Sequence, residues 1–197
     1  KYIYDKKNRE KYKKEFKYCL MIIIGTIPVG LLGVLFKDEI ETTLSKTWIV
    51  GLMFIITGIC LLIVKNINGN KGDYDITYKD AIIIGLIEGL ALFPGLSRSG
   101  MVLVGCLLCK LNKTSALKYT FMLYFPVSVE TMLLGVKDVI ETGISANLLI
   151  YYLIGTVFSF IFTYLTYKVL TEIVRKGKLW KFSIYLFIIG IFVLLYL

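Results

Sequence analysis

The sequence predicts an all-α polytopic membrane protein with five transmembrane spans and one re-entrant helical hairpin, which form part of an inverted-repeat fold. Three observations lead to this prediction. Of the 197 residues, 57% are apolar and only 19% are charged, whereas soluble domains carry about 25% charged residues. The apolar residues form long uncharged runs, and the basic residues gather in some of the connections between them. This composition excludes a soluble globular domain, a disordered chain and a collagen-like chain.

Five uncharged or nearly uncharged runs predict the spans. Each has 16 to 20 residues, and at ~1.5 Å per residue such helices cover most or all of a hydrocarbon core ~30 Å thick. The third run contains Pro126 and Glu130. In chain order, the predicted spans are Tyr18–Phe36, Thr47–Val64, Tyr119–Val136, Leu148–Tyr167 and Phe182–Leu197.

Two further apolar runs, Ala81–Pro94 and Gly100–Cys109, are too short to cross a membrane alone. Residues 94–100 between them contain one proline and two glycines, which predict a non-helical tip. We expect Gly100 to open the returning helix. Non-helical backbone at membrane depth is tolerated only inside protein or beside a wet cavity, so the sequence predicts a hairpin over 81–109 with a polar cavity at its tip.

The distribution of basic residues predicts the topology. Segment 1–17 carries eight Lys or Arg, and loop 168–181 carries five. Because positively charged loops stay in the cytoplasm, we place the N-terminus of this chain inside and the C-terminus outside. With the hairpin entering and leaving on one side, the cytoplasmic segments hold nineteen basic residues and the outer loops three. A single crossing by 81–109 would instead put loop 168–181 outside.

We interpret residues 1–197 as a single membrane domain. Segment 1–17 is a basic cytoplasmic lead-in, 18–64 holds two spans of an incomplete first repeat, and 81–197 is a second repeat that includes the hairpin. A matching first repeat would need one more span and one more hairpin before Lys1. The chain begins with Lys rather than Met, and we therefore expect it to be truncated at the N-terminus.

Several functional classes are disfavoured by the residue content. The formal net charge is +9, but the basic residues follow the membrane pattern, so we expect no nucleic-acid partner. The four cysteines lie inside apolar runs and are typical of small packing residues. Cys106 and Cys109 form a C-x-x-C pair, but the chain has no histidine and no second pair, so we expect no metal ligand in this chain. The lack of histidine also removes the usual general base.

The polar centre is the tip Gly95-Leu-Ser-Arg-Ser-Gly100. An arginine at membrane depth costs at least ~2.5 kcal/mol and is usually functional. The Arg98 guanidinium offers a fixed fork of donors that suits phosphate oxygens, and Ser97 and Ser99 add hydroxyl groups. Gly95 and Gly100 let backbone N–H groups approach a ligand, and the N-terminus of the returning helix favours an anion. The tip therefore predicts a phosphate site, with Arg98, Ser97 and Ser99 as catalytic candidates and Gly95 and Gly100 as substrate-binding candidates.

Two carboxylates complete the candidate set, and one alternative stays open. Glu88 interrupts an apolar helix, so we expect it to face the wet cavity and to bind substrate. Glu130 follows Pro126 by about one helical turn and is expected to line the same cavity. Alternatively, Arg98 is a structural ion-pair partner of Glu88 or Glu130. A P-loop is excluded, because Met101 and Val102 stand where that motif needs Lys and Ser or Thr.

The stretch from Ile84 to Gly100, IGLIEGLALFPGLSRSG, resembles the second signature of the bacterial undecaprenyl-diphosphate phosphatases, the BacA/UppP bacitracin-resistance family. The Thr26-Ile-Pro28 element, the lead-in from Thr77 to Ala81 and the span with Pro126 also resemble the family. Arg98 matches the family's essential arginine, Ser97 and Ser99 match its flanking hydroxyls, and Glu88 falls where members carry Glu or Gln. The family's first signature, with its carboxylates, serine and histidine, is not found in this sequence.

The resemblance implies a function in the bacterial plasma membrane. Members convert undecaprenyl diphosphate to undecaprenyl phosphate and phosphate, which recycles the cell-wall lipid carrier. The resemblance also implies two re-entrant hairpins, a site open to the outer face, and a divalent cation (Mg²⁺ or Ca²⁺) whose ligands we expect upstream of Lys1. The expected partners are a polyprenyl diphosphate and membrane lipids, and a homodimer stays open. The alternative is a transporter or flippase for polyprenyl phosphate or another anion. We predict that the 197 residues alone do not hydrolyse the diphosphate.

Overall fold

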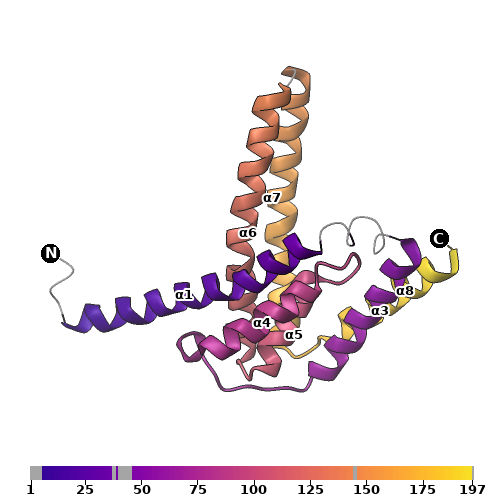
Figure 1. The fold of residues 1–197 in the computed structure, drawn as a ribbon. Coiled ribbons are helices and arrows are strands. Elements are labelled where there is room, and N and C mark those ends of the chain that lie inside the picture. Colours follow the sequence, from indigo (N-terminus) through magenta and orange to yellow (C-terminus); the bar gives the residue numbers. More distant parts are fainter. Residues whose placement is uncertain (1–5, 37–38, 40–45, 144–145, 197) are drawn as a thin grey trace.

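The computed structural model describes residues 6–36, 39, 46–143 and 146–196. This part of the chain is built from seven α-helices and one short 3-10 helix, without a β-strand (Figure 1). In chain order the helices are α1 (Lys6–Leu35), α3 (Thr47–Val64), η2 (Asp73–Asp75), α4 (Tyr78–Leu90), α5 (Arg98–Leu108), α6 (Lys113–Thr142), α7 (Ala146–Arg175) and α8 (Trp180–Tyr196).

Each of the five predicted spans overlaps one of these helices over most of its length, and the run Thr47–Val64 coincides with α3. The basic lead-in is largely helical too, because α1 begins at Lys6. Four helices are long and apolar enough to cross a membrane, namely Arg9–Leu35, Thr47–Val64, Lys113–Glu141 and Ile150–Arg175. The apolar helix Trp180–Tyr196 is slightly shorter, with 17 residues.

The two short helices of the predicted hairpin are present as α4 and α5, with residues 91–97 between them. The expectation that Gly100 opens the returning helix is wrong. Helix α5 begins at Arg98, because the Ser97 side chain caps it by accepting a hydrogen bond from the backbone N–H of Gly100. The non-helical tip therefore spans 91–97 rather than 94–100, and Arg98 and Ser99 lie in the first turn of α5.

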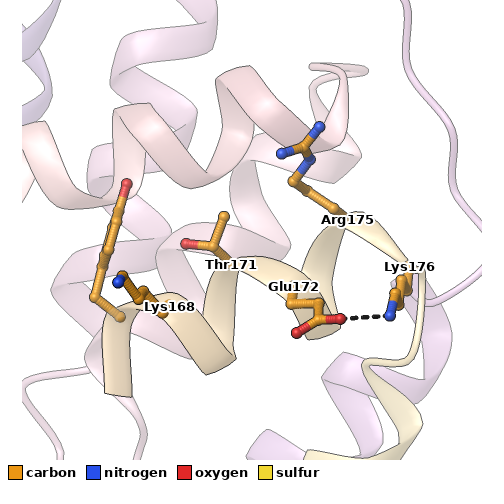
Figure 2. A pocket seen from close by; sticks show the side chains of 6 residues that line it. Lys168, Thr171, Glu172, Arg175 and Lys176 are labelled. Atoms are coloured by element: carbon orange, nitrogen blue, oxygen red, sulfur yellow. Dashed lines mark hydrogen bonds and ion pairs between the residues drawn. The ribbon is translucent and has the colours of Figure 1, made fainter. Parts of the chain in front are cut away.

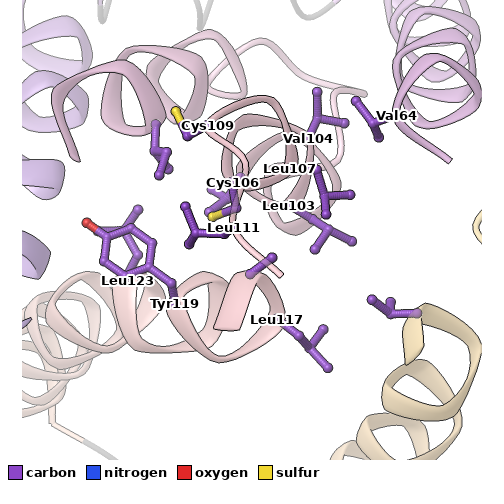
Figure 3. Packing of buried hydrophobic residues seen from close by; sticks show 14 of the residues in the cluster. Val64, Leu103, Val104, Cys106, Leu107, Cys109, Leu111, Leu117, Tyr119 and Leu123 are labelled. Carbon is purple, nitrogen blue, oxygen red and sulfur yellow. The ribbon is translucent and has the colours of Figure 1, made fainter. Parts of the chain in front are cut away.

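Helix α5 lies at the centre of the hydrophobic core (Figure 3). Every residue from Met101 to Leu107 is buried, which is the pattern of a helix surrounded by protein on all sides. With 11 residues and ~1.5 Å of rise for each, it is far shorter than a transmembrane helix. Cys106 and Cys109 are buried in this apolar cluster as free thiols, in agreement with their predicted packing role.

Close helix crossings join α1 and α6 to this centre. A Cβ atom at Gly85 of α4 would lie 2.1 Å from the carbonyl oxygen of Gly25 in α1, so this crossing requires glycine. The Tyr119 hydroxyl of α6 donates a hydrogen bond to the Met21 carbonyl of α1 over 2.7 Å. These contacts place the start of α6 beside α4 and α5, where the candidate site lies.

Two helix pairs extend from the centre. Helices α3 and α8 pack along each other, and a Cβ atom at Gly190 would lie 2.8 Å from the carbonyl oxygen of Gly51. Helices α6 and α7 form a long pair that projects away from the rest, drawn in orange in Figure 1. Most side chains along this projecting part of α7 are exposed and apolar or aromatic, as expected for helices whose surroundings are lipid.

Candidate functional site

An ion pair joins the two short helices. Glu88 lies in the last turns of α4 and Arg98 is the first residue of α5. The Nε atom of Arg98 donates to Oε1 of Glu88 over 2.7 Å, and its Nη2 atom contacts the same oxygen. The Glu88 side chain is only 1% exposed and that of Arg98 is 25% exposed. The structural pairing that the sequence left as an alternative is therefore present, with Glu88 as the partner.

This pairing leaves part of the arginine fork available. A guanidinium has five N–H donors, and the contacts with Glu88 use the Nε donor and one on Nη2. The centre of the guanidinium also lies 5.6 Å from the ring centroid of Tyr124 in α6, within cation–π range. Arg98 is thus held from two sides, and three of its donors remain for an oxyanion.

The predicted polar cavity is present beside this pair. It has a volume of about 300 Å³ and lies between α4, α5 and the first half of α6. Its wall combines one carboxylate, one guanidinium and three hydroxyl-bearing side chains with apolar groups. The lining residues are Glu88, Arg98, Ser99, Val102, Thr120, Phe121 and Tyr124.

The structure separates the roles of the two candidate serines. Ser99 lines the cavity. Ser97 does not, and its Oγ atom accepts the hydrogen bond from the backbone N–H of Gly100 over 3.2 Å. At the start of a helix the first N–H groups have no carbonyl partner within the helix, and the helix dipole favours an anion there. The N–H groups of Arg98 and Ser99 occupy this position, next to the guanidinium.

Helix α3 supports the loop that carries the site. The hydroxyl of Thr57, which is fully buried, accepts a hydrogen bond from the Ser97 backbone N–H over 3.2 Å and donates one to the Met53 carbonyl over 3.0 Å. Gly95 adopts φ = +94°, and a Cβ atom there would lie 2.5 Å from the Val50 carbonyl oxygen. A Cβ atom at Gly100 would lie 3.0 Å from the Ser97 Oγ. Neither predicted glycine lines the cavity: Gly95 shapes the loop, and Gly100 packs beside Ser97 in the first turn of α5.

Of the predicted residues, the structure brings together Glu88, Arg98 and Ser99. Glu130 lies exposed on α6 and does not line the cavity, so the expectation that it shares the cavity is not met. The sequence analysis missed Thr57 and Tyr124. Tyr124 is one of fourteen tyrosines, and no local pattern distinguishes it. Thr57 carried a weak signal, as a polar residue inside an otherwise apolar run.

The described residues offer little to a metal ion on their own. Among them, no group of three or more His, Cys, Asp or Glu side chains is close enough to hold one. The second carboxylate oxygen of Glu88 is buried and has no hydrogen-bond partner. One oxygen is far short of the six or more that Mg²⁺ and Ca²⁺ require, so these residues do not form a complete divalent-cation site.

The fold and the cavity define a multi-pass helical membrane protein with a polar, arginine-containing site between two short helices. The chain belongs to the family of the bacitracin resistance protein BacA, which it matches over residues 1–192.

Relatives in this family are similar along nearly the whole chain. The chain is 39% identical over 188 residues to undecaprenyl-diphosphatase 2 of Bacillus thuringiensis (strain Al Hakam). This alignment covers 95% of this chain and 70% of that relative. It is 35% identical over 193 residues to the undecaprenyl-diphosphatase of Oceanobacillus iheyensis. That alignment covers 97% of this chain and 70% of the relative. The family match over residues 1–192 includes every residue that lines the cavity.

Proposed function

We propose that the protein is an undecaprenyl-diphosphate phosphatase, which releases phosphate from undecaprenyl diphosphate and so recycles the lipid carrier of cell-wall synthesis. Family membership and the names of its relatives support this function. The structural observation that carries it is the position of Arg98. Arg98 lines the cavity together with Ser99, stands at the N-terminus of α5, and keeps three donors that Glu88 does not use, an arrangement suited to a phosphate group.

In this function, Arg98 binds the diphosphate and stabilises the charge that develops on its oxygens in the transition state. Glu88 and Tyr124 hold the guanidinium in place. Ser99 and the backbone N–H groups of Arg98 and Ser99 orient the phosphate. Ser97 and Gly95 shape the loop, and Gly100 packs beside Ser97 at the start of α5. We place Glu130 outside the site, because it is exposed on α6.

The charge balance of the cavity supports a requirement for a divalent cation. The negative charge of Glu88 offsets the positive charge of Arg98, so the cavity lining carries no net formal charge. A diphosphate brings several negative charges, which such a cavity does not neutralise. We therefore propose that Mg²⁺ or Ca²⁺ enters with the substrate, held chiefly by the phosphate oxygens and by groups other than the described residues.

We also propose a topology of five spans and one re-entrant hairpin, formed by α4 and α5, in which the hairpin and the last three spans make up one repeat of an inverted-repeat fold. The short length of α5 and its burial on all sides support this. The basic residues after α7 support a cytoplasmic N-terminus and an outer C-terminus for this chain. Two single-cysteine variants, Lys176→Cys and Gly143→Cys, test the proposal. Each is expressed in intact cells and exposed to a thiol reagent that does not cross the membrane. We expect labelling at 143 and protection at 176, and the reverse pattern contradicts the topology.

The function is tested by phosphate release from undecaprenyl diphosphate by the purified full-length protein. We expect Arg98→Lys to lower kcat/KM by at least about 100-fold, because lysine lacks the bidentate fork. The matched control is Arg9→Lys, the same exchange at an exposed position of α1. Near-normal phosphate release by Arg98→Lys contradicts the assigned role. Transport of the lipid phosphate across vesicles without phosphate release would favour the flippase alternative.

A further inference from the structure

A second polar feature lies at the C-terminal end of α7, apart from the Arg98 cavity. It is a recess of about 560 Å³, lined by Tyr167, Lys168, Thr171, Glu172, Arg175 and Lys176 (Figure 2). From Lys168 to Lys176 the lining residues recur at helical spacing, so they share one face of α7. In Figure 2, Thr171 and Arg175 project from the same side of the helix, while Glu172 turns towards Lys176.

The recess carries a surplus of positive charge. Its three cations face one carboxylate, that of Glu172, which is already paired with Lys176. Lys168 contacts the ring of Tyr164, with its Nζ atom 4.4 Å from the centroid. Neither Lys168 nor Arg175 forms an ion pair with any residue that the structure describes. Two cations are therefore available to an anion.

The hydroxyl of Thr171 is unusual among the threonines of these helices. Its oxygen is buried and makes no hydrogen bond within the described part of the chain. Five other helical threonines donate this hydrogen bond to the carbonyl four residues earlier: Thr26, Thr57, Thr120, Thr131 and Thr156. A buried hydroxyl without a partner is costly, and a rotation of the Thr171 side chain about χ1 would turn this hydroxyl towards an oxyanion in the recess that Thr171 lines.

Simpler explanations cover only part of this arrangement. Cations at the end of a helix stabilise its dipole, and basic residues next to a span orient it in the membrane. These effects account for Arg175 and Lys176. They also account for Lys168, which belongs to the same basic segment, but not for the apolar cavity that adjoins the recess.

An apolar cavity adjoins the recess and shares Tyr167 with it. It has a volume of about 570 Å³, and its wall is mostly aromatic and aliphatic, with Phe121, Phe160, Phe162, Tyr164, Tyr167 and Leu170 among its residues. The rings of Phe121 and Tyr167 meet edge to face, with centroids 5.0 Å apart. A basic recess next to an apolar cavity at the end of a membrane-spanning helix fits an amphiphile with an anionic head group.

We propose that this surface of α7 binds an anionic phospholipid. The phosphate of the head group lies in the recess, in contact with Lys168, Thr171 and Arg175, and an acyl chain lies in the adjoining apolar cavity. The basic recess shares no lining residue with the Arg98 cavity, although Phe121 lines both that cavity and the apolar one, and the proposal does not depend on the phosphatase function.

The test uses the full-length protein in vesicles or nanodiscs of mixed phosphatidylglycerol and phosphatidylcholine, with bound lipid counted by native mass spectrometry. We expect selective retention of phosphatidylglycerol. Arg175→Gln and Lys168→Gln should each weaken it by about fivefold, the contribution of one basic residue to binding an anionic lipid. The matched control, Lys181→Gln, removes the same charge from the same basic region outside the recess, and should bind like the wild type.

Three outcomes would overturn the proposal. An equal loss of phosphatidylglycerol retention in all three variants would show a general charge effect without a specific site. Equal retention of both lipids would show that the head-group charge is not recognised. Displacement of phosphatidylglycerol by inorganic phosphate at the same concentration would assign the recess to free phosphate. Because Lys168 and Arg175 are exposed on α7, we expect both variants to fold, and a monodisperse elution profile with wild-type thermal stability confirms this.

Discussion

The Nε atom of Arg98 lies 2.7 Å from Oε1 of Glu88, and this contact ties the start of α5 to the end of α4. The two residues are ten positions apart in the chain, on either side of a loop that contains one proline and one glycine. Their pairing gives the guanidinium a fixed direction in the cavity. It also keeps the buried carboxylate of Glu88 from being an isolated charge, which would be strongly unfavourable.

Removing Glu88 should therefore destabilise the protein as well as lower its activity. Loss of one partner from a buried pair costs about 3–5 kcal/mol, and we expect Glu88→Ala to approach this range in denaturant unfolding of the solubilised protein. Glu88→Gln keeps an acceptor for the guanidinium and should lose less stability. It should nevertheless lower kcat, because a neutral partner fixes the guanidinium less firmly. Wild-type stability in Glu88→Ala would show that the pair has no structural role.

Glu130 provides a contrasting carboxylate. It is exposed on α6 and does not line the cavity, so we expect Glu130→Gln to change kcat/KM by less than about twofold, as for most surface substitutions. The measurement is phosphate release under the conditions used for Glu88→Gln. A tenfold loss in Glu130→Gln would instead restore the site proposed from the sequence.

Thr57 should act as a positioning residue through the loop. Its buried hydroxyl accepts the Ser97 backbone N–H over 3.2 Å. Thr57→Val keeps the shape but leaves that N–H unpaired, and we expect kcat to fall by about tenfold with a smaller change in KM. Thr57→Ser keeps the hydroxyl and should restore most of the activity. Equal activity of the Val and Ser variants would show that the hydrogen bond does not contribute.

Gly95 should tolerate no side chain. Its φ of +94° is a backbone conformation that residues with a side chain rarely adopt. A Cβ atom at this position would also lie 2.5 Å from the Val50 carbonyl oxygen. We expect Gly95→Ala to lower the free energy of unfolding by about 1–3 kcal/mol. Gly135→Ala is the matched control, because a Cβ atom there meets nothing within 4 Å. It should leave stability unchanged or raise it slightly. Equal thermal unfolding of the two variants would contradict this difference.

Stability should also depend on pH through Asp80. Burial raises the pKa of Asp80, but hydrogen bonds from Lys71 and Thr77 outweigh it, so the pKa lies below its usual value. A group with a lowered folded-state pKa contributes stability above its unfolded pKa of about 3.9, and this contribution is lost as pH falls through the folded pKa.

We therefore expect thermal stability to decline below about pH 4, and Asp80→Asn to be less stable at neutral pH with a weaker dependence on acid. Unfolding curves of both proteins between neutral pH and acid check this. Parallel pH profiles for the wild type and the variant would show that Asp80 does not contribute.

Each predicted helix is present, although α1, α6 and α7 extend beyond the predicted runs, because hydrophobic runs and breakers are local signals. The run Thr47–Val64 coincides with α3, and Pro94 and Gly95 fall in the loop between α4 and α5. The error at Gly100 has a local cause as well. Glycine is a helix breaker on average, but the Ser97 cap starts α5 before it and close packing beside Ser97 and Thr57 keeps Gly100 inside the first turn.

By itself, the sequence determined the class of this protein, the order of its helices and the proposed centre of its site at Arg98, because composition, run length and an arginine at membrane depth each have a direct physical meaning. Only the tertiary structure decided which groups hold Arg98 and the loop that precedes it. Glu88, Thr57 and Tyr124 come from α4, α3 and α6, and no spacing along the chain specifies such contacts. Glu130 was misplaced for the same reason, since helical periodicity gives a face but not what that face meets.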